Sequence, residues 1–149
     1  MRVWRVSRHR DLTGIGGLYV AGRWHTRGHL ITYAGEHPAT AQLEWLAHLD
    51  VTRPEDAPTT IPFCEIDLPD DLVRDELTET DLPPGWQTNQ IETQRLGDSW
   101  LDAGKSAVIF VPSVLVPARN VLLNPQHPHA VRVRIVRSFD HPFDNRFLR

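Results

Sequence analysis

The spacing of hydrophobic and polar residues along this chain changes repeatedly, and it predicts several short strands. VWRVS, next to the N-terminus, alternates as a half-buried strand does. HLITYAG and IPFCEIDL contain the β-branched and aromatic residues favoured in strands, and SAVIFV is a continuous apolar run typical of a buried strand. AVRVRIV places Val131, Val133 and Ile135 on one face, and LVRDELTE is read, more weakly, as a further strand.

Two segments instead have helical spacing. Residues 38–49 begin with a proline that suits a first helical turn, and their apolar residues recur at helical intervals. Residues 88–104 form the second predicted helix, which Thr88 can cap and Gly104 can end. Gly97 lies inside this helix, where glycine is less favourable than alanine by about 1 kcal/mol.

Prolines and polar residues interrupt the remaining segments. VTRPEDAPTT and the C-terminal DHPFDNRFLR are predicted to be irregular, and the prolines of VPSVLVP and NVLLNPQHP are expected to break the preceding strand. No repeat or linker divides the chain. The pattern therefore predicts an α+β fold, in which one domain over residues 1–149 combines many short strands with two main helices.

Composition narrows the class of protein. With 149 residues, 40% hydrophobic and 23% charged, the chain matches an ordinary globular domain and not a disordered or fibrous protein. Its net charge of −3 argues against non-specific binding to nucleic acid. No apolar run approaches the roughly 18 residues of a membrane span, and the N-terminus lacks the apolar region of a secretory signal.

The single cysteine, Cys64, excludes an intrachain disulfide and favours a cytoplasmic protein. Because Cys64 lies inside a predicted strand, we expect it to be a small buried residue and not a nucleophile.

Three polar residues are candidates for a functional site. Arg23 follows Gly22 in a glycine-flanked segment, and its guanidinium suits a phosphate or a carboxylate. Tyr33 lies in a predicted strand, and Glu44 lies at the margin of the apolar face of the first helix. Spacing alone favours a surface arginine, a core tyrosine and a solvated glutamate, so it does not by itself assign these residues a function.

The histidines do not form a recognisable metal motif. His25 and His29 are four residues apart, which suits zinc only on a helix, and Gly22 and Gly28 argue against a helix there. The chain also has one cysteine and no HExxH. We therefore expect no metal site.

Motifs for nucleophilic or nucleotide chemistry are equally weak. Ser113 does not lie in GxSxG, GIGG does not complete GxGxxG, and there is no Walker loop. The basic cluster of Arg132, Arg134 and Arg137 is predicted to be an exposed strand face. These residues alone therefore predict only an α+β protein, for which an anion-binding site is one possible function.

Several motifs taken together go further, because the sequence resembles the RES domain family, toxins of bacterial toxin–antitoxin pairs. The family is named for an arginine, a glutamate and a serine, which match Arg23 in GRWHTRG, Glu44 in HPATAQLEWLAH and Ser113 in VPSVLVPARNVLLNPQHP. Tyr33 in ITYAGE, together with GDSWL, NPQHP and FDNRF, extends the resemblance over nearly the whole chain. Residues 51–85 carry little of this signature.

The resemblance implies a fold related to ADP-ribosyltransferases and NAD⁺ as the substrate. Members of the family resemble enzymes that split the nicotinamide–ribose bond, some as phosphorylases and others as ADP-ribosyltransferases acting on a protein. NAD⁺ is then a substrate and not a cofactor, and inorganic phosphate is a candidate co-substrate. The implied partner is an Xre-type helix-turn-helix antitoxin, which would supply any contact with DNA.

The chemistry of this reaction suggests roles for the matched residues. Glu44 would stabilise the oxocarbenium-like transition state, and Arg23 would hold the pyrophosphate or an attacking phosphate. Tyr33 would stack on nicotinamide, and Ser113 would fix a ribose or amide group.

Three further residues are candidates for substrate binding. His25 and Arg27 lie close to Arg23 in the sequence, and Asn124 lies in NPQHP. The sequence leaves open whether water, phosphate or a protein is the acceptor. It also leaves two alternatives to an NAD⁺-degrading enzyme, a nucleotide-binding module without turnover and a histidine–metal hydrolase.

Overall fold

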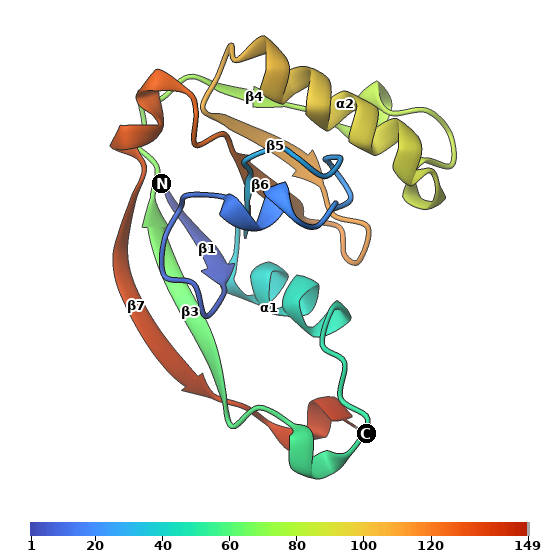
Figure 1. Ribbon diagram of the computed structural model, residues 1–149, viewed down its shortest axis with the longest axis vertical. Coiled ribbons are helices and arrows are strands. Elements are labelled where there is room, and N and C mark those ends of the chain that lie inside the picture. Colours follow the sequence, from blue (N-terminus) through green and yellow to red (C-terminus); the bar gives the residue numbers. More distant parts are fainter. Residues whose placement is uncertain (149) are drawn as a thin grey trace.

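A curved sheet of seven strands organises the chain, and the computed structural model describes residues 1–148 (Figure 1). The spatial order is β4-β5-β6-β2-β1-β3-β7, and every neighbouring pair is antiparallel except β4 and β5. The strands are β1 (Arg2–Val6), β2 (Thr32–Gly35), β3 (Thr60–Asp67), β4 (Arg74–Glu76), β5 (Val108–Pro112), β6 (Arg119–Leu123) and β7 (Arg134–Pro142).

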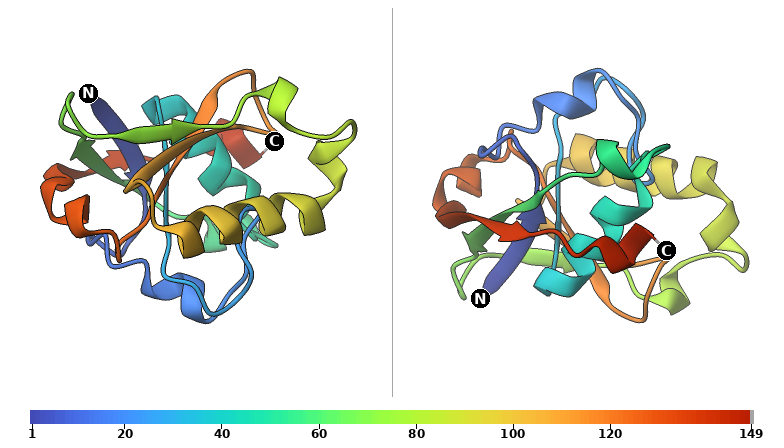
Figure 2. Two further views of the ribbon diagram at one scale, coloured as in Figure 1. Left: turned by 90° about the horizontal axis from the view of Figure 1, so that it is seen from above. Right: turned by 90° about the horizontal axis from the view of Figure 1, so that it is seen from below.

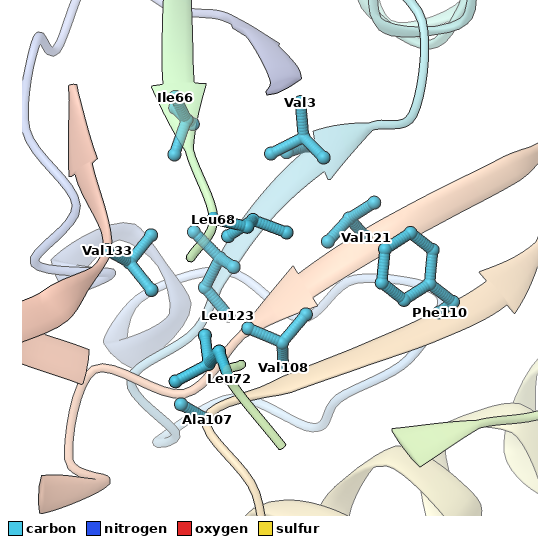
Figure 3. Packing of buried hydrophobic residues seen from close by; sticks show 11 residues of the cluster. Val3, Ile66, Leu68, Leu72, Ala107, Val108, Phe110, Val121, Leu123 and Val133 are labelled. Carbon is cyan, nitrogen blue, oxygen red and sulfur yellow. The ribbon is translucent and has the colours of Figure 1, made fainter. Parts of the chain in front are cut away.

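The main hydrophobic core lies between the two halves of this sheet. β1, β3 and β7 run at a steep angle to β4, β5 and β6, so side chains from both halves meet (Figure 3). Val3 and Ile66 from one half pack in the same cluster as Phe110 and Val121 from the other. Burial of each large apolar side chain contributes about 1.5–3 kcal/mol, so this packing holds the curvature of the sheet.

The opposite face of the central strands carries a second core beneath α2 (Gln90–Ala103). Ile109 and Val111 alternate with the first-core residues of β5, as the period of a strand requires, and pack with Trp24, Trp86 and Trp100. Seen at right angles to the view of Figure 1, α2 lies towards the periphery, whereas α1 (Pro38–Ala47) lies near the centre (Figure 2). α1 packs against β1, β2 and β6.

The predicted α+β class, with short strands and two main helices, is confirmed. The first helix ends two residues earlier than predicted, at Ala47, and the Nδ1 atom of His37 caps its start by accepting a bond from the backbone N–H of Ala39. In the second helix the cap is Asn89 and not Thr88, which belongs to the preceding 3₁₀ turn η4 (Trp86–Thr88).

Two sequence predictions at the C-terminal end of the chain are wrong. NVLL was expected to be interrupted by prolines, but it forms β6 in the middle of the sheet, because Pro117 and Pro125 fall outside the strand. The alternating segment AVRVRIV begins as the 3₁₀ turn η5 (Pro128–Arg132), which leaves Val131 78% exposed. The strand β7 starts only at Arg134 and continues into the tail predicted to be irregular.

β7 is an edge strand, which explains why it tolerates both proline and exposed charge. Of the predicted basic cluster, Arg137 pairs with Glu65 of β3, and Arg132, just before the strand, pairs with Asp71.

Cys64 is fully buried in β3, as expected. Within residues 1–148, no helix is both long enough and apolar enough to cross a membrane.

Gly97 generates a prediction about stability, because a Cβ atom at this position of α2 would overlap the backbone carbonyl of Trp24. We expect Gly97→Ala to lower the free energy of unfolding by about 1–3 kcal/mol through overpacking, although alanine is the better helix former. Urea denaturation measures this change. Ser99→Ala, at an exposed position of the same helix, is the control and should change stability by less than about 0.5 kcal/mol. A Gly97→Ala variant as stable as the control would contradict the close packing.

Candidate active site

The centre of the candidate site is the carboxylate of Glu44, which α1 presents to the ends of β5 and β6. The hydroxyl of Ser113 donates a hydrogen bond to Oε1 of Glu44 at 2.8 Å, and Nδ2 of Asn120 donates a second bond to the same oxygen at 2.7 Å. Hydrogen bonds to a charged acceptor are stronger than those between neutral groups, so these two donors fix the carboxylate firmly.

The turn after β5 fixes the orientation of Ser113. The Ser113 hydroxyl accepts the backbone N–H of Leu115 at 3.1 Å, and the backbone N–H of Ser113 donates to the carbonyl of Ala118 at 2.9 Å. The hydroxyl proton is therefore directed to Glu44, and the oxygen is occupied by its own turn. In this arrangement Ser113 holds the carboxylate and is not set up as a nucleophile.

α1 can approach the sheet closely because β2 ends in Gly35. A Cβ atom at Gly35 would overlap the backbone nitrogen of Ala41, one turn before Glu44. Gly35 also pairs with Asn120 across β2 and β6. The missing side chain thus lets the first turn of the helix rest on the strand, and this contact places Glu44 above Asn120.

α2 holds the segment that carries Arg23. The hydroxyl of Thr93 donates to the carbonyl of Arg23 at 2.6 Å, and Nε2 of Gln94 donates to the carbonyl of Gly22 at 2.9 Å. The segment has almost no regular structure of its own, so side chains of the helix take the place of a strand partner.

The side chain of Arg23 is half-buried and keeps donors for a ligand. One guanidinium nitrogen donates to the carbonyl of Gln87 at 3.1 Å, and within residues 1–148 the other nitrogens make no hydrogen bond. The same Gln87 helps to line an open pocket of about 270 Å³ beside Ser113. Its lining residues are Glu79, Trp86, Gln87, Ser113, Val114, Leu115, Val116 and Pro117.

Tyr33 and His25 form a buried hydrogen-bonded chain behind Arg23. The Tyr33 hydroxyl accepts the backbone N–H of Trp24 at 3.1 Å and lies 2.7 Å from Nδ1 of His25, whose Nε2 lies 2.9 Å from the carbonyl of Val20. Because a carbonyl only accepts, Nε2 carries the proton and Nδ1 accepts the hydroxyl proton of Tyr33.

Burial keeps both members of this pair uncharged. Loss of solvation raises the pKa of the Tyr33 phenol above its ordinary value and lowers the pKa of His25, against the opposing effect of the Val20 carbonyl. His25 is 3% exposed, and both of its ring nitrogens are engaged within the chain. It therefore supports Tyr33 and contributes no positive charge to a ligand at neutral pH.

The structure gathers some of the sequence-predicted site residues and leaves others apart. Glu44 and Ser113 are bonded to each other, and Tyr33 bonds to the residue next to Arg23. Arg27 is exposed in the following turn.

Asn124 lies at the opposite end of β6 from Asn120. There its Nδ2 donates to the carbonyl of Leu101, near the end of α2, at 3.4 Å. It is 3% exposed and is not part of the cluster around Glu44.

Asn120 is the site residue that sequence reasoning missed. Because the prolines of NVLLNPQHP predict a break, the sequence pattern gives no reason to expect the amide of Asn120 on a buried face. Once RNVLL is recognised as a strand, Asn120 is a polar residue whose side chain shares a face with Leu122 of the second core. A buried amide in such a position is the signal that could have identified it.

Three of the eight histidines make structural contacts in the described part of the chain. His37 caps α1, His25 supports Tyr33, and His29 lies 3.4 Å from a carboxylate oxygen of Asp98 on α2. Among residues 1–148, no three histidine, cysteine or acidic side chains are grouped so that they could hold a metal ion.

Comparison with known proteins identifies the family of the chain. Residues 2–144 match the RES domain family. A protein named Toxin Res from Pseudomonas putida is 42% identical over 136 residues, which cover 91% of this chain and 92% of that protein. The Prs ADP-ribosylating toxin of Sphingobium sp. is 34% identical, with coverage of 98% of this chain and 96% of the relative.

A solved structure shares the fold. It belongs to the M. tuberculosis MbcT–MbcA toxin–antitoxin complex, and the superposition has a TM-score of 0.69 with 18% sequence identity. It covers 95% of this chain and 84% of the other chain.

The His25–Tyr33 bond generates a prediction about pH. The pKa of His25 is lowered on folding from 6.5, so the unfolded chain takes up this proton first as the pH falls, and stability declines from about pH 6.5 down through the lowered value. His25→Gln should therefore lose less stability than the wild type between about pH 7.5 and pH 5.5 in urea denaturation. His48→Gln, at an exposed position just after α1, should retain the wild-type pH dependence. Parallel losses in His25→Gln and the wild type would refute the buried neutral histidine.

Proposed function

Because the chain belongs to the RES domain family, we propose that it is the toxin of a bacterial toxin–antitoxin pair and that it degrades NAD⁺ at the nicotinamide–ribose bond. The observation that carries the proposal is the carboxylate of Glu44, held through one oxygen by Ser113. The names of the relatives, Toxin Res and Prs ADP-ribosylating toxin, support both the toxicity and the use of NAD⁺.

A single carboxylate is sufficient for this reaction. Nicotinamide is cationic in NAD⁺ and leaves as a neutral molecule with the electron pair of the broken bond, so no general acid is needed, in contrast to ordinary glycosidases. Within residues 1–148, Oε2 of Glu44 makes no hydrogen bond, and this oxygen would accept the hydroxyls of the nicotinamide ribose. A fixed negative charge beside the developing oxocarbenium ion accelerates such a step by about 10²–10³-fold.

The other matched residues would bind the two ends of the substrate. The unengaged nitrogens of Arg23 would bind the pyrophosphate, because a guanidinium forms paired hydrogen bonds with oxyanions. The hydroxyl of Tyr33 is occupied by Trp24 and His25, so the ring and not the hydroxyl would contact nicotinamide.

Inorganic phosphate is the acceptor that we propose. A phosphate oxygen would attack C1″ of the ribose as the bond to nicotinamide breaks, which gives neutral nicotinamide and ADP-ribose-1″-phosphate. A phosphate bound next to the ribose has a high effective concentration compared with an unbound nucleophile. Since His25 is neutral, Arg23 and the exposed Arg27 would provide the positive charge for both anions.

The proposed partner is an Xre-type antitoxin that covers the cleft around Arg23 and Glu44. An enzyme that consumes NAD⁺ depletes its own host unless it is inhibited, and the neighbour of similar fold was solved as a toxin–antitoxin complex. Occlusion of the cleft would inhibit the enzyme without unfolding it.

Growth and nicotinamide release test the proposal together. Expression of the wild type should stop growth, and co-expression of the antitoxin encoded beside it should restore growth and block NAD⁺ turnover. Arg23→Ala and Glu44→Ala should each abolish toxicity and lower nicotinamide release by about 100-fold or more.

Circular dichroism should show both variants folded. Arg95→Ala and Glu55→Gln change the same residue types at exposed positions and should remain toxic. A toxic Glu44→Ala variant would refute the catalytic role of this carboxylate. Full NAD⁺ turnover in a saturated antitoxin complex would refute occlusion, and NAD⁺ binding without nicotinamide release would favour a non-catalytic nucleotide-binding module.

Product analysis tests the acceptor. Nicotinamide release by the purified wild type should accelerate with added phosphate, and ADP-ribose-1″-phosphate should appear in an amount equal to nicotinamide. Plain ADP-ribose that is insensitive to phosphate would identify a glycohydrolase. Label transferred from NAD⁺ to a protein would identify an ADP-ribosyltransferase.

A further inference from the structure

Asn120 is buried in β6 although nothing in the core requires an amide there. The residue is 8% exposed, its strand neighbours are Val111 and Gly35, and the next residue on the same face is Leu122. A hydrophobic residue of similar volume would satisfy these neighbours. The reason for asparagine therefore has to be sought in what its amide contacts.

The two ends of this amide are used unequally. Nδ2 donates to Oε1 of Glu44 at 2.7 Å, whereas Oδ1 is buried and has no hydrogen-bond partner within residues 1–148. An unpaired buried carbonyl destabilises a protein, so Asn120 is unfavourable for the fold taken by itself. The bond to Glu44 is the one side-chain hydrogen bond that the described structure gives Asn120.

Asn120 is a second hydrogen-bond donor to Glu44, and it restricts the orientation of the carboxylate more than Ser113 alone can. One hydrogen bond holds the distance of a carboxylate oxygen but leaves the group free to rotate about that contact. Ser113 at the end of β5 and Asn120 in β6 reach the same oxygen from two strands. Together they fix the plane of the carboxylate and leave Oε2 as the oxygen available to a ligand.

We propose that Asn120 is a positioning residue for Glu44, and that it turns Oε2 of this carboxylate towards the ribose hydroxyls of the substrate. The inference rests on the proposed function and adds a residue to its machinery. Asn120 acts through Glu44 and not by contact with the substrate. Its loss should lower kcat, because misplacement of a reacting group by about 1 Å can cost about 100-fold, and should leave KM nearly unchanged.

Two near-isosteric variants separate positioning from space-filling. Asn120→Asp keeps the shape but replaces the donor with a second carboxylate facing Glu44, and Asn120→Leu removes the donor and the unpaired carbonyl together. Each should lower kcat for nicotinamide release from NAD⁺ by about ten- to 100-fold, with KM within about threefold of the wild type. Asn120→Leu should keep a melting temperature close to that of the wild type. If Asn120→Leu does not fold, Asn120→Asp carries the test.

Ser106→Ala is the matched control. Ser106 is also buried and bonded, to Trp100 and Asp75, but it lies before β5 and away from Glu44. This variant should lose stability and keep kcat within about twofold. Wild-type kcat in either Asn120 variant would overturn the proposal, because a residue that only fills space tolerates an isostere.

A folding measurement keeps the inference separate from the proposed function. In a double-mutant cycle of Asn120→Leu and Glu44→Ala, the two positions should be coupled by about tenfold in the unfolding equilibrium constant. If the wild type releases no nicotinamide but this coupling is present, the proposed reaction fails and the positioning of Glu44 stands. Absence of coupling overturns the positioning itself.

Discussion

The placement of Arg23 depends on the approach of α2 to the backbone of Trp24, which only a glycine at position 97 permits. The segment around Arg23 lies outside the sheet ladders, so it takes its shape from Thr93 and Gln94 on one side and from Tyr33 on the other. If the helix lay farther away, these side chains would not reach the segment. The absence of a side chain at Gly97 of α2 thus determines where the segment that carries the guanidinium of Arg23 lies.

The site is built at some cost to the stability of the fold. Three buried side-chain atoms in the described chain lack a hydrogen-bond partner: Nε1 of Trp24, Oγ1 of Thr32 and Oδ1 of Asn120. Asn120 is a site residue, and Trp24 and Thr32 are the sequence neighbours of Arg23 and Tyr33. Each unpaired polar group costs about 1–3 kcal/mol, and burial of apolar residues in the two cores offsets this loss.

How much of the structure could be predicted depended on whether the information was local. The spacing of apolar residues identifies both helices and most strands, because this periodicity can be recognised within a short segment of sequence. It failed at RNVLL, where nearby prolines suggested a break, because proline is excluded from a strand and not from the turns beside it. It also misplaced the start of β7, since alternation in AVRVRIV does not distinguish a strand from a short 3₁₀ turn followed by one.

The same limit applies to the site. Arg23, Tyr33, Glu44 and Ser113 match a family signature, but the bond between Glu44 and Ser113 depends on how the helix and the strands of the sheet are arranged. No local pattern shows that Asn120 meets Glu44, or that His25 is enclosed and used by Tyr33. The sequence pattern predicts only that Gly97 weakens the helix. The need for glycine there comes from the close approach to the backbone of Trp24, which is distant in the sequence.

Those long separations have a consequence for synthesis of the chain. Glu44 meets Ser113 across 69 positions and Asn120 across 76, and β6, which contains Asn120, lies between β5 and β2 in the finished sheet. Non-local pairing is slow and must wait for the later segment. A ribosome that has translated only the first two-thirds of the message therefore carries a chain in which Glu44 still lacks Ser113 and Asn120 as hydrogen-bond donors. The hydrogen bonds that hold Glu44 therefore form late in synthesis, and this delay would give the proposed antitoxin time to meet the new chain.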